Sequence, residues 1–289
     1  MARKIAVLIA GPTASGKSAL ALEMARETGG VVVNTDALQV YEGLRLLTAR
    51  PSEAEQALAP HRLYGTVPAA RRFSTGEWAR AVQQVLAEAD DAPLIFAGGT
   101  GLYFDALTKG FAGVPDVPAA AVAAAEAEVA GLDGAARGRL IAARDPAIAA
   151  RLRAPDPQRV VRALAVLHAT GRSLASFQDA PQTPLLAGRD IERLVLDPDR
   201  QVLRERIAQR FAAMLGQGAA AEVEALLARG LDPSLPVMKA IGVREIGEWL
   251  AGRLDRDEMV ERAVIATRQY AKRQRTWFRN RMADWPRRA

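Results

Sequence analysis

The segment Gly11-Pro-Thr-Ala-Ser-Gly-Lys-Ser18 has the residue types and spacing of a phosphate-binding P-loop. Glycines allow backbone N–H groups to curl around an anion, while Lys17 adds a mobile positive charge and Ser18 a hydroxyl that can bind Mg²⁺. We therefore predict that Ser18 is the metal ligand. The whole segment is predicted to hold a phosphate chain through Gly11, Pro12, Thr13, Ala14, Ser15, Gly16, Lys17 and Ser18.

This motif does not by itself indicate ATP or GTP hydrolysis. A hydrolysing NTPase usually carries an apolar strand that ends in Asp and holds Mg²⁺. Here the apolar run 94–97 ends in Gly98-Gly-Thr-Gly101, and the run 193–196 leads into Asp197-Pro-Asp199, which is equally typical of a helix start. Motor and GTPase functions are therefore disfavoured, and transferases that use a diphosphate remain open.

Two polar residues follow predicted strands and are candidates for the reaction itself. Asp36 comes directly after the run 31–33, and Thr100 comes directly after the run 94–97. Because the carboxyl ends of parallel strands meet at one edge of a sheet, we expect both residues to lie near the P-loop. Each of them is also a common turn residue, so this placement alone does not establish a role.

The elements that must position these residues alternate along the chain. Short apolar runs bounded by glycine or proline predict strands, and longer amphipathic stretches predict helices. Such alternation is typical of a parallel α/β sheet flanked by helices, here of the P-loop kinase-like kind. The predicted strands are 5–10, 31–33, 94–97 and 193–196, and the predicted helices are 18–27, 76–89, 157–171, 199–229 and 257–282.

The middle of the chain has a different character. Between Pro115 and Gln182 there is no convincing strand, much alanine and repeated proline. Asp156-Pro157 is a good helix start, with Gly171 as the stop. We predict a small all-helical insertion domain over 113–182, within a P-loop core formed by 1–112 and 183–289.

Composition narrows the function classes. The 289 residues contain no Cys and two His, which excludes disulfides, thiolate metal sites and a cysteine nucleophile. No apolar run is long enough to span a bilayer, so we expect a cytoplasmic protein without a membrane partner. The net charge of +6 is concentrated after residue 261, where nine Lys and Arg face one acid. This basic helical C-terminal arm, interleaved with aromatic residues, is typical of phosphate-backbone binding.

Seven segments of the chain, in order and nearly end to end, resemble the bacterial tRNA dimethylallyltransferase family, also called tRNA isopentenyltransferases or IPP transferases. They are Gly11–Ser18, Asp36-Ala-Leu-Gln-Val-Tyr41, Thr48-Ala-Arg-Pro51, Gly98-Gly-Thr-Gly-Leu-Tyr103, Asp156-Pro-Gln-Arg-Val-Val-Arg-Ala163, Ala240-Ile-Gly242, and Ala266–Gln274 with Thr276-Trp-Phe-Arg279.

The resemblance implies a reaction. The family transfers a dimethylallyl group from dimethylallyl diphosphate to N6 of the adenosine on the 3′ side of the anticodon, in tRNAs that read codons beginning with U, and releases diphosphate without hydrolysing ATP. The exocyclic amine of adenine is a poor nucleophile, and the resemblance assigns Asp36 as its general base. Lys17 and Mg²⁺ would neutralise the departing diphosphate, and Thr100 would act beside Asp36 in catalysis.

Further expectations, most of them implied by the resemblance, concern which residues contact the diphosphate and which contact the tRNA. Independently of the resemblance, Arg206 and Arg210 lie one turn apart on the predicted helix 199–229 and could face the diphosphate or the edge of the core; we list both as candidate diphosphate contacts. A monomer without an obligate protein partner is expected, with the anticodon stem-loop of tRNA as the macromolecular substrate. The implied tRNA contacts are Asp36, Ala37, Leu38, Gln39, Thr100, Gln158, Arg159, Val160, Val161, Arg162, Lys239, Arg244, Arg268, Lys272, Arg273 and Arg275.

The chain departs from the family pattern at several positions, and the acidic end that the family usually has after His61 is missing, since Tyr64-Gly65 follows Leu63. The family usually has Ser-Met where this chain has Ala37-Leu38, and a glycine where this chain has Leu47. Three alternatives stay open: a P-loop kinase for a small metabolite, an isopentenyltransferase that acts on a free adenine nucleotide, and a tRNA-binding protein without activity. The intact Lys17, Ser18, Asp36 and Thr100 disfavour the last of these.

Overall fold

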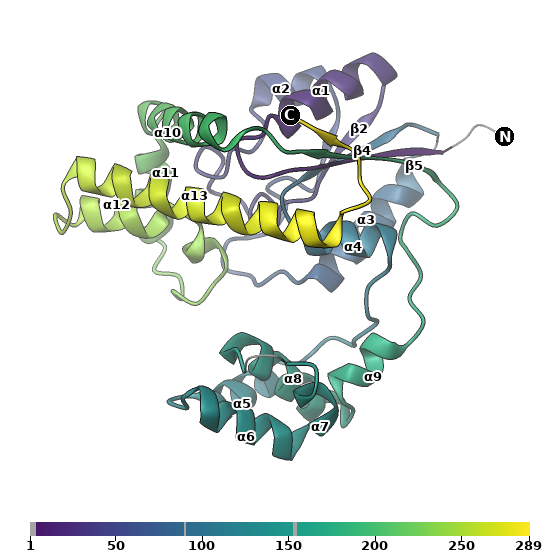
Figure 1. The fold of residues 1–289 in the computed structure, drawn as a ribbon. Helices are drawn as coiled ribbons and strands as arrows, with labels where there is room; N and C mark the ends of the chain where they lie inside the picture. The colour runs from purple at the N-terminus through teal and green to yellow at the C-terminus, as the bar shows by residue number, and fades with distance from the viewer. Residues whose placement is uncertain (1–3, 90, 153–154) are drawn as a thin grey trace. The chain divides into compact units, whose positions relative to one another are not determined.

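The described residues of the computed structural model, 4–89, 91–152 and 155–289, include one six-stranded parallel sheet (Figure 1). Its strand order is β3-β2-β4-β1-β5-β6, so the first strand lies inside the sheet, between β4 and β5. The strands are β1 (Ile5–Ala10), β2 (Val31–Asn34), β3 (His61–Arg62), β4 (Leu94–Gly98), β5 (Asp190–Leu196) and β6 (Arg287–Arg288).

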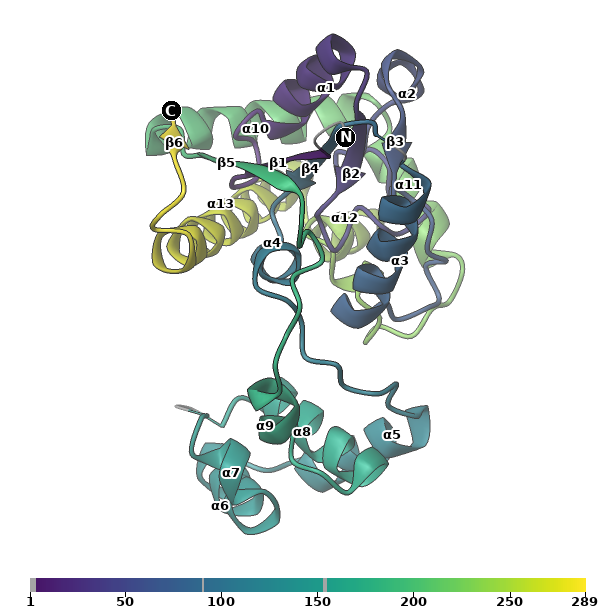
Figure 2. The ribbon, with the colours of Figure 1, turned by 90° about the vertical axis from the view of Figure 1, so that its right-hand side faces the viewer.

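The central strands are short and apolar because both of their faces are covered. In β1 and β4 the side chains of Leu8, Ile9 and Phe96 are fully buried, as expected for parallel strands between two layers of helices. Helix α1 (Lys17–Thr28) packs on one face of the sheet, and α3 (Thr75–Glu88) and α4 (Gly101–Thr108) lie on the other (Figure 2). The small α2 (Glu53–Leu58) begins at a capping box and leads into β3.

The remaining helices of this unit follow β5. Because no strand intervenes, they pack against one another beside the C-terminal end of the sheet, and α13 contacts α10, α12 and α4. They are α10 (Arg200–Gly216), α11 (Ala219–Leu227), α12 (Val243–Leu250) and the long α13 (Arg256–Arg281), with a short 3₁₀ turn at Val237–Lys239.

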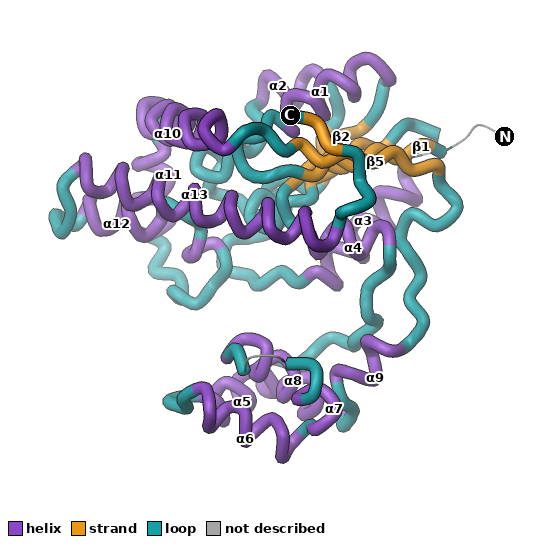
Figure 3. Tube along the Cα trace, viewed as in Figure 1, coloured by secondary structure: helices purple, strands orange, loops and turns teal. Residues whose placement is uncertain are grey.

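Residues 109–184 form a second compact unit. It holds its own apolar core, in which Ile141, Val160 and Leu164 are almost fully buried. Figure 3 shows helices and loops in this unit, while every strand of the described residues belongs to 1–108 and 185–289. Its helices are α5 (Ala119–Val129), α6 (Gly134–Arg144), α7 (Pro146–Ala149), α8 (Pro157–Thr170) and α9 (Leu174–Asp179).

The predicted parallel sheet flanked by helices is confirmed. One element was predicted wrongly: the single helix expected over 199–229 is two helices, because Gly218 takes a φ of +103° that a continuing α-helix cannot contain. The short strands β3 and β6 and the helix that begins at Gly101 were not predicted. No helix within the described ranges is long and apolar enough to cross a bilayer.

Candidate active site

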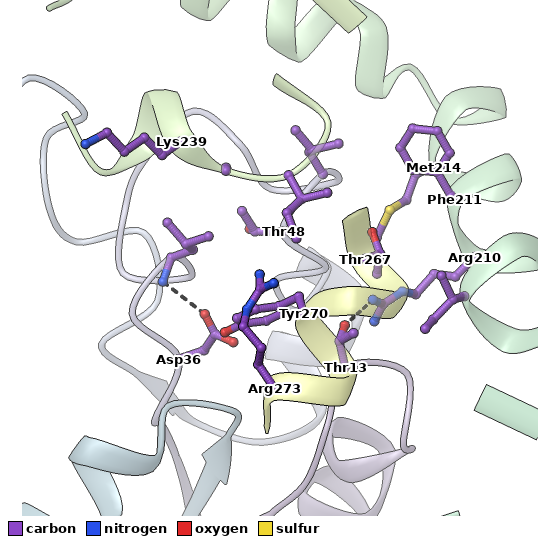
Figure 4. Close-up of a pocket in the computed structure, with 15 residues that line it drawn as sticks. Thr13, Asp36, Thr48, Arg210, Phe211, Met214, Lys239, Thr267, Tyr270 and Arg273 are labelled. Atoms are coloured by element: carbon purple, nitrogen blue, oxygen red, sulfur yellow. Dashed lines mark hydrogen bonds between the residues drawn. The ribbon is translucent and has the colours of Figure 1, made fainter. Parts of the chain in front are cut away.

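The chemistry-bearing residues meet at the carboxyl edge of the sheet. The P-loop follows β1, Asp36 follows β2 and Thr100 follows β4. Thr13 of the P-loop and Asp36 border a cavity of about 280 Å³, whose other walls come from α10, α13 and the segments 47–48 and 239–241 (Figure 4). The cavity is lined by Thr13, Asp36, Leu38, Leu47, Thr48, Ile207, Arg210, Phe211, Met214, Lys239, Ala240, Ile241, Thr267, Tyr270 and Arg273.

The P-loop has the backbone geometry of an anion cradle. Gly16 lies at φ +93° directly before α1, a conformation that a side chain would strain. The Lys17 ammonium group donates to the Pro12 carbonyl at 3.2 Å. The backbone N–H of Thr13 is held by the side chain of Gln274 on α13, at 2.9 Å from Oε1. The positive end of α1 therefore opens toward a loop that α13 holds in place.

Two cations stand at this loop. Burial lowers the pKa of Lys17 to about 8, while Asp36 raises it and Arg210 lowers it. Burial likewise lowers the pKa of Arg210, which Asp36 partly offsets. The Arg210 guanidinium donates to the Thr13 hydroxyl (Figure 4). Two partly desolvated cations so close together repel each other, and a bound anion would relieve that repulsion.

Asp36 is held by the end of its own strand. The Asn34 amide brackets it: Oδ1 accepts from the Asp36 backbone N–H at 2.8 Å, and Nδ2 donates to the Asp36 carbonyl at 2.9 Å. The same Nδ2 donates to the carbonyl of Leu63, at 3.0 Å. The Asp36 carboxylate accepts from the Leu38 N–H at 2.9 Å through Oδ1 and faces the cavity with its other oxygen available (Figure 4).

Thr100 braces the loop that carries Asp36. Its hydroxyl oxygen accepts from the backbone N–H of Ala37 at 2.9 Å, and its own N–H donates to the carbonyl of Thr35 at 3.0 Å. A Cβ at Gly98 would lie 2.2 Å from the Thr35 carbonyl carbon, so only glycine allows the two loops to approach this closely. Thr100 therefore fixes the backbone next to Asp36, and its hydroxyl proton stays free to donate elsewhere.

Gln39, like Thr100, holds a backbone turn in place through its side chain. Its amide Nε2 donates to the carbonyls of Thr48 and Ala49, at 2.8 and 3.0 Å. On the other side of this turn, the Glu222 carboxylate accepts from the backbone N–H groups of Leu46 and Leu47. Both side chains therefore set the shape of the 44–49 turn, which supplies Leu47 and Thr48 to the cavity wall.

Leu47 stands at the position where the family pattern has glycine, and its side chain packs against Gly242. A Cβ at Gly242 would lie 2.7 Å from Leu47 Cδ1, so the leucine packs on the bare Gly242 backbone. Leu47 is 8% exposed and still lines the cavity.

Tyr270 and Arg273 reach the cavity from α13. Burial, and then the charge of Asp36, raise the pKa of the Tyr270 phenol above its ordinary value, so the phenol stays protonated at neutral pH. The Arg273 guanidinium lies 5.8 Å from the centre of the Tyr270 ring, and both side chains lie beside Asp36 in Figure 4. A proton donor and a cation thus lie next to the carboxylate in the cavity.

Backbone strain gathers around this site. Among the described residues, only three other than glycine have positive φ: Ala14 in the P-loop, Ala49 in the turn held by Gln39, and Leu63, whose carbonyl binds Asn34. Each left-handed residue costs of order 1 kcal/mol. All three lie in loops that shape the cavity, which is where such strain is commonly tolerated for function.

The structure separates the residues predicted on α13 and α10. Of the four α13 cations, Arg273 alone lines the cavity, while Arg268, Lys272 and Arg275 line a different groove. On α10, Arg210 lines the cavity, whereas Arg206 is exposed one turn earlier.

The other predicted RNA contacts lie in the 237–244 segment and in the second unit. Lys239 lines the cavity and Arg244 is exposed. On α8 the side chains of Gln158, Arg159 and Arg162 are exposed, and Val161 is partly buried. Val160 is fully buried in the core of the second unit, so its side chain serves packing, and we do not retain it as a contact.

Sequence reasoning missed several residues that position the site. The sequence does not reveal the partners of Asn34, Glu222 and Gln274, because each of these side chains acts on a backbone group far away in the sequence or hidden in a turn. Phe211 and Met214 on α10 read as ordinary core positions. The one available signal was polarity: Asn34 ends an otherwise β-branched run, and Gln274 lies on the buried face of α13.

The fold and this site together define a P-loop α/β protein whose phosphate loop opens on a partly apolar cavity with a carboxylate across from it. A model of the family described as IPP transferase matches residues 39–281, and the chain belongs to this family.

Relatives match over nearly the whole chain. It is 52% identical over 285 residues to the tRNA dimethylallyltransferase of Chelativorans sp. strain BNC1, covering 98% of each chain. It is 54% identical over 284 residues to that of Methylobacterium sp. strain 4-46, covering 97% of this chain and 92% of the relative.

Solved structures agree. The full-length tRNA isopentenylpyrophosphate transferase from Bacillus halodurans matches with a TM-score of 0.67 and 28% identity, over 99% of this chain and 90% of that one. A eukaryotic dimethylallyltransferase, crystallised while acting on tRNA, matches with a TM-score of 0.80 and 26% identity, over 95% of this chain and 70% of that one.

Proposed function

We propose that this enzyme transfers a dimethylallyl group from dimethylallyl diphosphate to N6 of the adenosine on the 3′ side of the anticodon in tRNA. The observation that carries the proposal is the single cavity shared by a phosphate loop, an apolar wall and a carboxylate. The apolar wall, formed by Ile207, Phe211 and Met214, suits a five-carbon prenyl chain. The close relatives, which carry the name of this activity, support the same reading.

The diphosphate is held at the P-loop in this proposal. Lys17 and Arg210 neutralise it, the N–H groups that precede α1 bind its oxygens, and Thr13 contacts it. Ser18, exposed in the first turn of α1, would hold Mg²⁺. This arrangement fits the ion, because Mg²⁺ commonly takes one or two protein oxygens together with phosphate oxygens and water. The bound ion would stabilise the charge of the leaving diphosphate.

The acceptor adenine enters from the Asp36 side of the cavity. The N6 amine attacks the allylic carbon, the C–O bond to the diphosphate breaks with its electron pair on oxygen, and the N6 proton passes to the free oxygen of Asp36. Asn34 and Thr100 keep the carboxylate oriented during this step. Tyr270 and Arg273 line the place where the base must fit after leaving its stack.

RNA contacts complete the proposal. We assign the tRNA contacts to exposed or partly buried side chains of the 36–39 loop, the 239–244 segment, α13 and α8, together with Thr100, and we treat residues 109–184 as a domain that contributes contacts to the RNA. The assigned side chains are Asp36, Ala37, Leu38, Gln39, Thr100, Gln158, Arg159, Val161, Arg162, Lys239, Arg244, Arg268, Lys272, Arg273 and Arg275. Arg206, exposed on α10, is a further proposed contact for dimethylallyl diphosphate, beside Arg210.

The test is incubation of the purified protein with dimethylallyl diphosphate and Mg²⁺, together with either unmodified tRNA or AMP. We expect prenylated adenosine in the tRNA digest and none on AMP. Prenylation of AMP but not of tRNA would replace this proposal with a free-nucleotide isopentenyltransferase. Phosphate transfer from ATP to a small hydroxyl compound, without prenylation, would favour the kinase.

A further inference from the structure

A second pocket adjoins the cavity at α10. It has a volume of about 200 Å³, is lined by α10 and by residues of the segment 45–55, and belongs wholly to the unit that carries the sheet. Among the described residues, Arg210 and Met214 line both the cavity and this pocket, and both reach the cavity from α10 (Figure 4). Their side chains therefore form part of the partition between the two spaces.

The turn 44–49 forms another part of the partition. Leu47 and Thr48 of this turn line the cavity, while their neighbours Leu46 and Ala49 line the pocket. The Gln39 amide donates to two carbonyls of the turn, so the backbone of the turn is held in place. The partition thus combines a fixed turn with two side chains of α10.

The two side chains that line both spaces differ in chemistry. The Arg210 guanidinium donates to the Thr13 hydroxyl and belongs to the proposed diphosphate site. The Met214 side chain is apolar and 8% exposed, so it closes the partition by packing. An unbranched thioether is well suited to filling an irregular gap. Shortening Met214 would therefore open the cavity into the pocket and leave the cations at the phosphate loop in place.

The spacing along α10 matches the length of one prenyl unit. Arg210 and Met214 are four residues apart, so their Cα atoms lie about 6 Å apart along the helix axis. With the diphosphate at Arg210, a prenyl chain that follows this face of α10 passes Phe211 and points to Met214. At about 1.5 Å per C–C bond, the four-carbon chain of a dimethylallyl group spans about 4 Å and stops short of Met214. A second isoprene unit adds about 5 Å and meets the Met214 side chain.

The opposite direction along α10 suits a longer hydrocarbon less well. Ile207, about one turn before Arg210, lines both the cavity and the groove that holds Arg268, Lys272 and Arg275. Six of the side chains along that groove are cationic. A hydrocarbon chain placed among them would displace water from charged groups, which is unfavourable. Enlarging the cavity at Ile207 therefore adds space beside charge.

We propose that Met214 ends the prenyl subsite and thereby limits the donor to a five-carbon allylic diphosphate, excluding longer allylic diphosphates. The inference rests on the proposed function, because it takes an allylic diphosphate as the donor, and it names the residue that sets the length of the transferred group. The juxtaposition that carries it is a buried apolar side chain, one helical turn from Arg210, between the cavity and an adjoining pocket.

The test compares two donors to unmodified tRNA: dimethylallyl diphosphate and geranyl diphosphate, which has ten carbons. The variants are Met214→Ala and the milder Met214→Val, which keeps more of the packing. Ile207→Ala is the matched control, because it enlarges the same cavity at another place. For each protein, kcat/KM is measured with each donor by mass spectrometry of the tRNA digest. The Kd for inorganic diphosphate reports whether the phosphate loop is intact.

We expect the wild type to use geranyl diphosphate about a hundredfold or more less efficiently than dimethylallyl diphosphate. Met214→Ala should reduce this ratio by about tenfold or more, and Met214→Val should reduce it by a smaller factor. Ile207→Ala should leave the ratio within about threefold of the wild type. The Kd for inorganic diphosphate should stay close to that of the wild type in all three variants.

A second substitution tests the path of the longer chain. Ala213 is exposed and lines the pocket behind Met214. Ala213→Leu, added to Met214→Ala, should refill the pocket and reverse the gain with geranyl diphosphate. A gain that survives in the double variant would contradict the proposed path through the partition.

Three other results would overturn the inference. They are an unchanged donor ratio in both Met214 variants, an equal gain in Ile207→Ala, and a wild type that uses both donors equally well. In each of these cases the transfer of a prenyl group to tRNA would still stand. If the wild type failed to prenylate tRNA with either donor, the proposed function itself would fail.

Discussion

At the scale of single residues, the site is organised by two cations that share one nearby carboxylate. Lys17 and Arg210 are both partly desolvated at the phosphate loop, and the one carboxylate that counters them, Asp36, is also the proposed base. A bound diphosphate would supply the missing negative charge and leave Asp36 free to accept a proton. In the proposed reaction, binding of the diphosphate and the ability of Asp36 to accept a proton are therefore coupled through these three side chains.

The first prediction concerns pH. Because burial lowers the pKa of Lys17 to about 8, its ammonium is charged below pH 7 and mostly neutral by pH 9. The affinity for inorganic diphosphate should therefore fall as the pH rises through 8, by up to about tenfold per pH unit. Isothermal titration calorimetry from pH 6 to 9.5 measures this. Lys17→Arg, whose guanidinium keeps its proton throughout, should abolish most of the fall; an equal fall in that variant would remove Lys17 as its cause.

A second residue-scale prediction concerns Asp36→Asn. The amide oxygen can still accept from the Leu38 N–H, so the loop should keep its shape while the base is lost. We expect kcat to fall by about 10² to 10⁴ with the Kd for tRNA changed less than about threefold. Single-turnover prenylation and filter binding measure the two quantities. Turnover close to that of the wild type would show that another group takes the N6 proton.

At the scale of elements, α13 connects the phosphate loop to the acceptor side of the cavity. Its Gln274, only 5% exposed, accepts from the Thr13 N–H and donates to the Gly99 carbonyl at 3.0 Å. The same helix carries Tyr270 and Arg273 to the cavity. A shift of α13 would therefore disturb both the phosphate loop and the side of the cavity that carries Tyr270 and Arg273.

The third prediction follows from this clamp. Gln274→Met keeps the volume but removes both hydrogen bonds, which leaves the Thr13 N–H and the Gly99 carbonyl without partners, at a cost of about 1–3 kcal/mol. We expect the KM for the donor to rise about tenfold, with a smaller change in the Kd for tRNA. Gln269→Met, at an exposed position of the same helix, is the matched control. If both variants lowered thermal stability equally and left the donor KM unchanged, Gln274 would be a structural residue only.

At the scale of the whole molecule, the chain leaves and re-enters the sheet-bearing unit at one place. The backbone N–H of Leu185 donates to the carbonyl of Ala106, and that of Leu186 donates to the carbonyl of Leu107, at 3.3 and 3.1 Å. The second unit has a core of its own that does not depend on these residues. The two chain segments that flank residues 109–184 therefore already lie side by side in the first unit.

The fourth prediction uses this closure. Replacing residues 109–184 with a short Gly-Ser linker should leave a folded protein. The linker only has to join two chain segments that already hydrogen-bond to each other. Its Kd for inorganic diphosphate should stay within about threefold of the wild type, while tRNA binding should weaken at least tenfold with the loss of Arg159 and Arg162. Circular dichroism and the two binding assays measure this. A protein with wild-type tRNA affinity would show that the second unit makes no RNA contact.

Local patterns in the sequence were sufficient wherever a property depends on neighbouring residues. The alternation of apolar runs and glycines predicts the parallel sheet. Asp156-Pro157 marks the start of α8 and Gly171 marks its end. The P-loop is recognisable from the spacing of its residues alone. The break at Gly218 was missed because a glycine within an amphipathic pattern does not reveal the sign of its φ.

What the sequence by itself determined is the phosphate loop, the sheet that presents it, the family and the concentration of positive charge in the last 28 residues. Only the tertiary structure decided how that charge is divided, because the direction of a side chain depends on which face of α13 packs against the core. Thus Arg273 lines the cavity that holds Asp36, and its neighbour Lys272 lines a different groove. Tertiary packing likewise gave Gln274 its two partners, one of them 261 positions away in the chain. Such contacts depend on the packing of distant segments, and no local pattern encodes them.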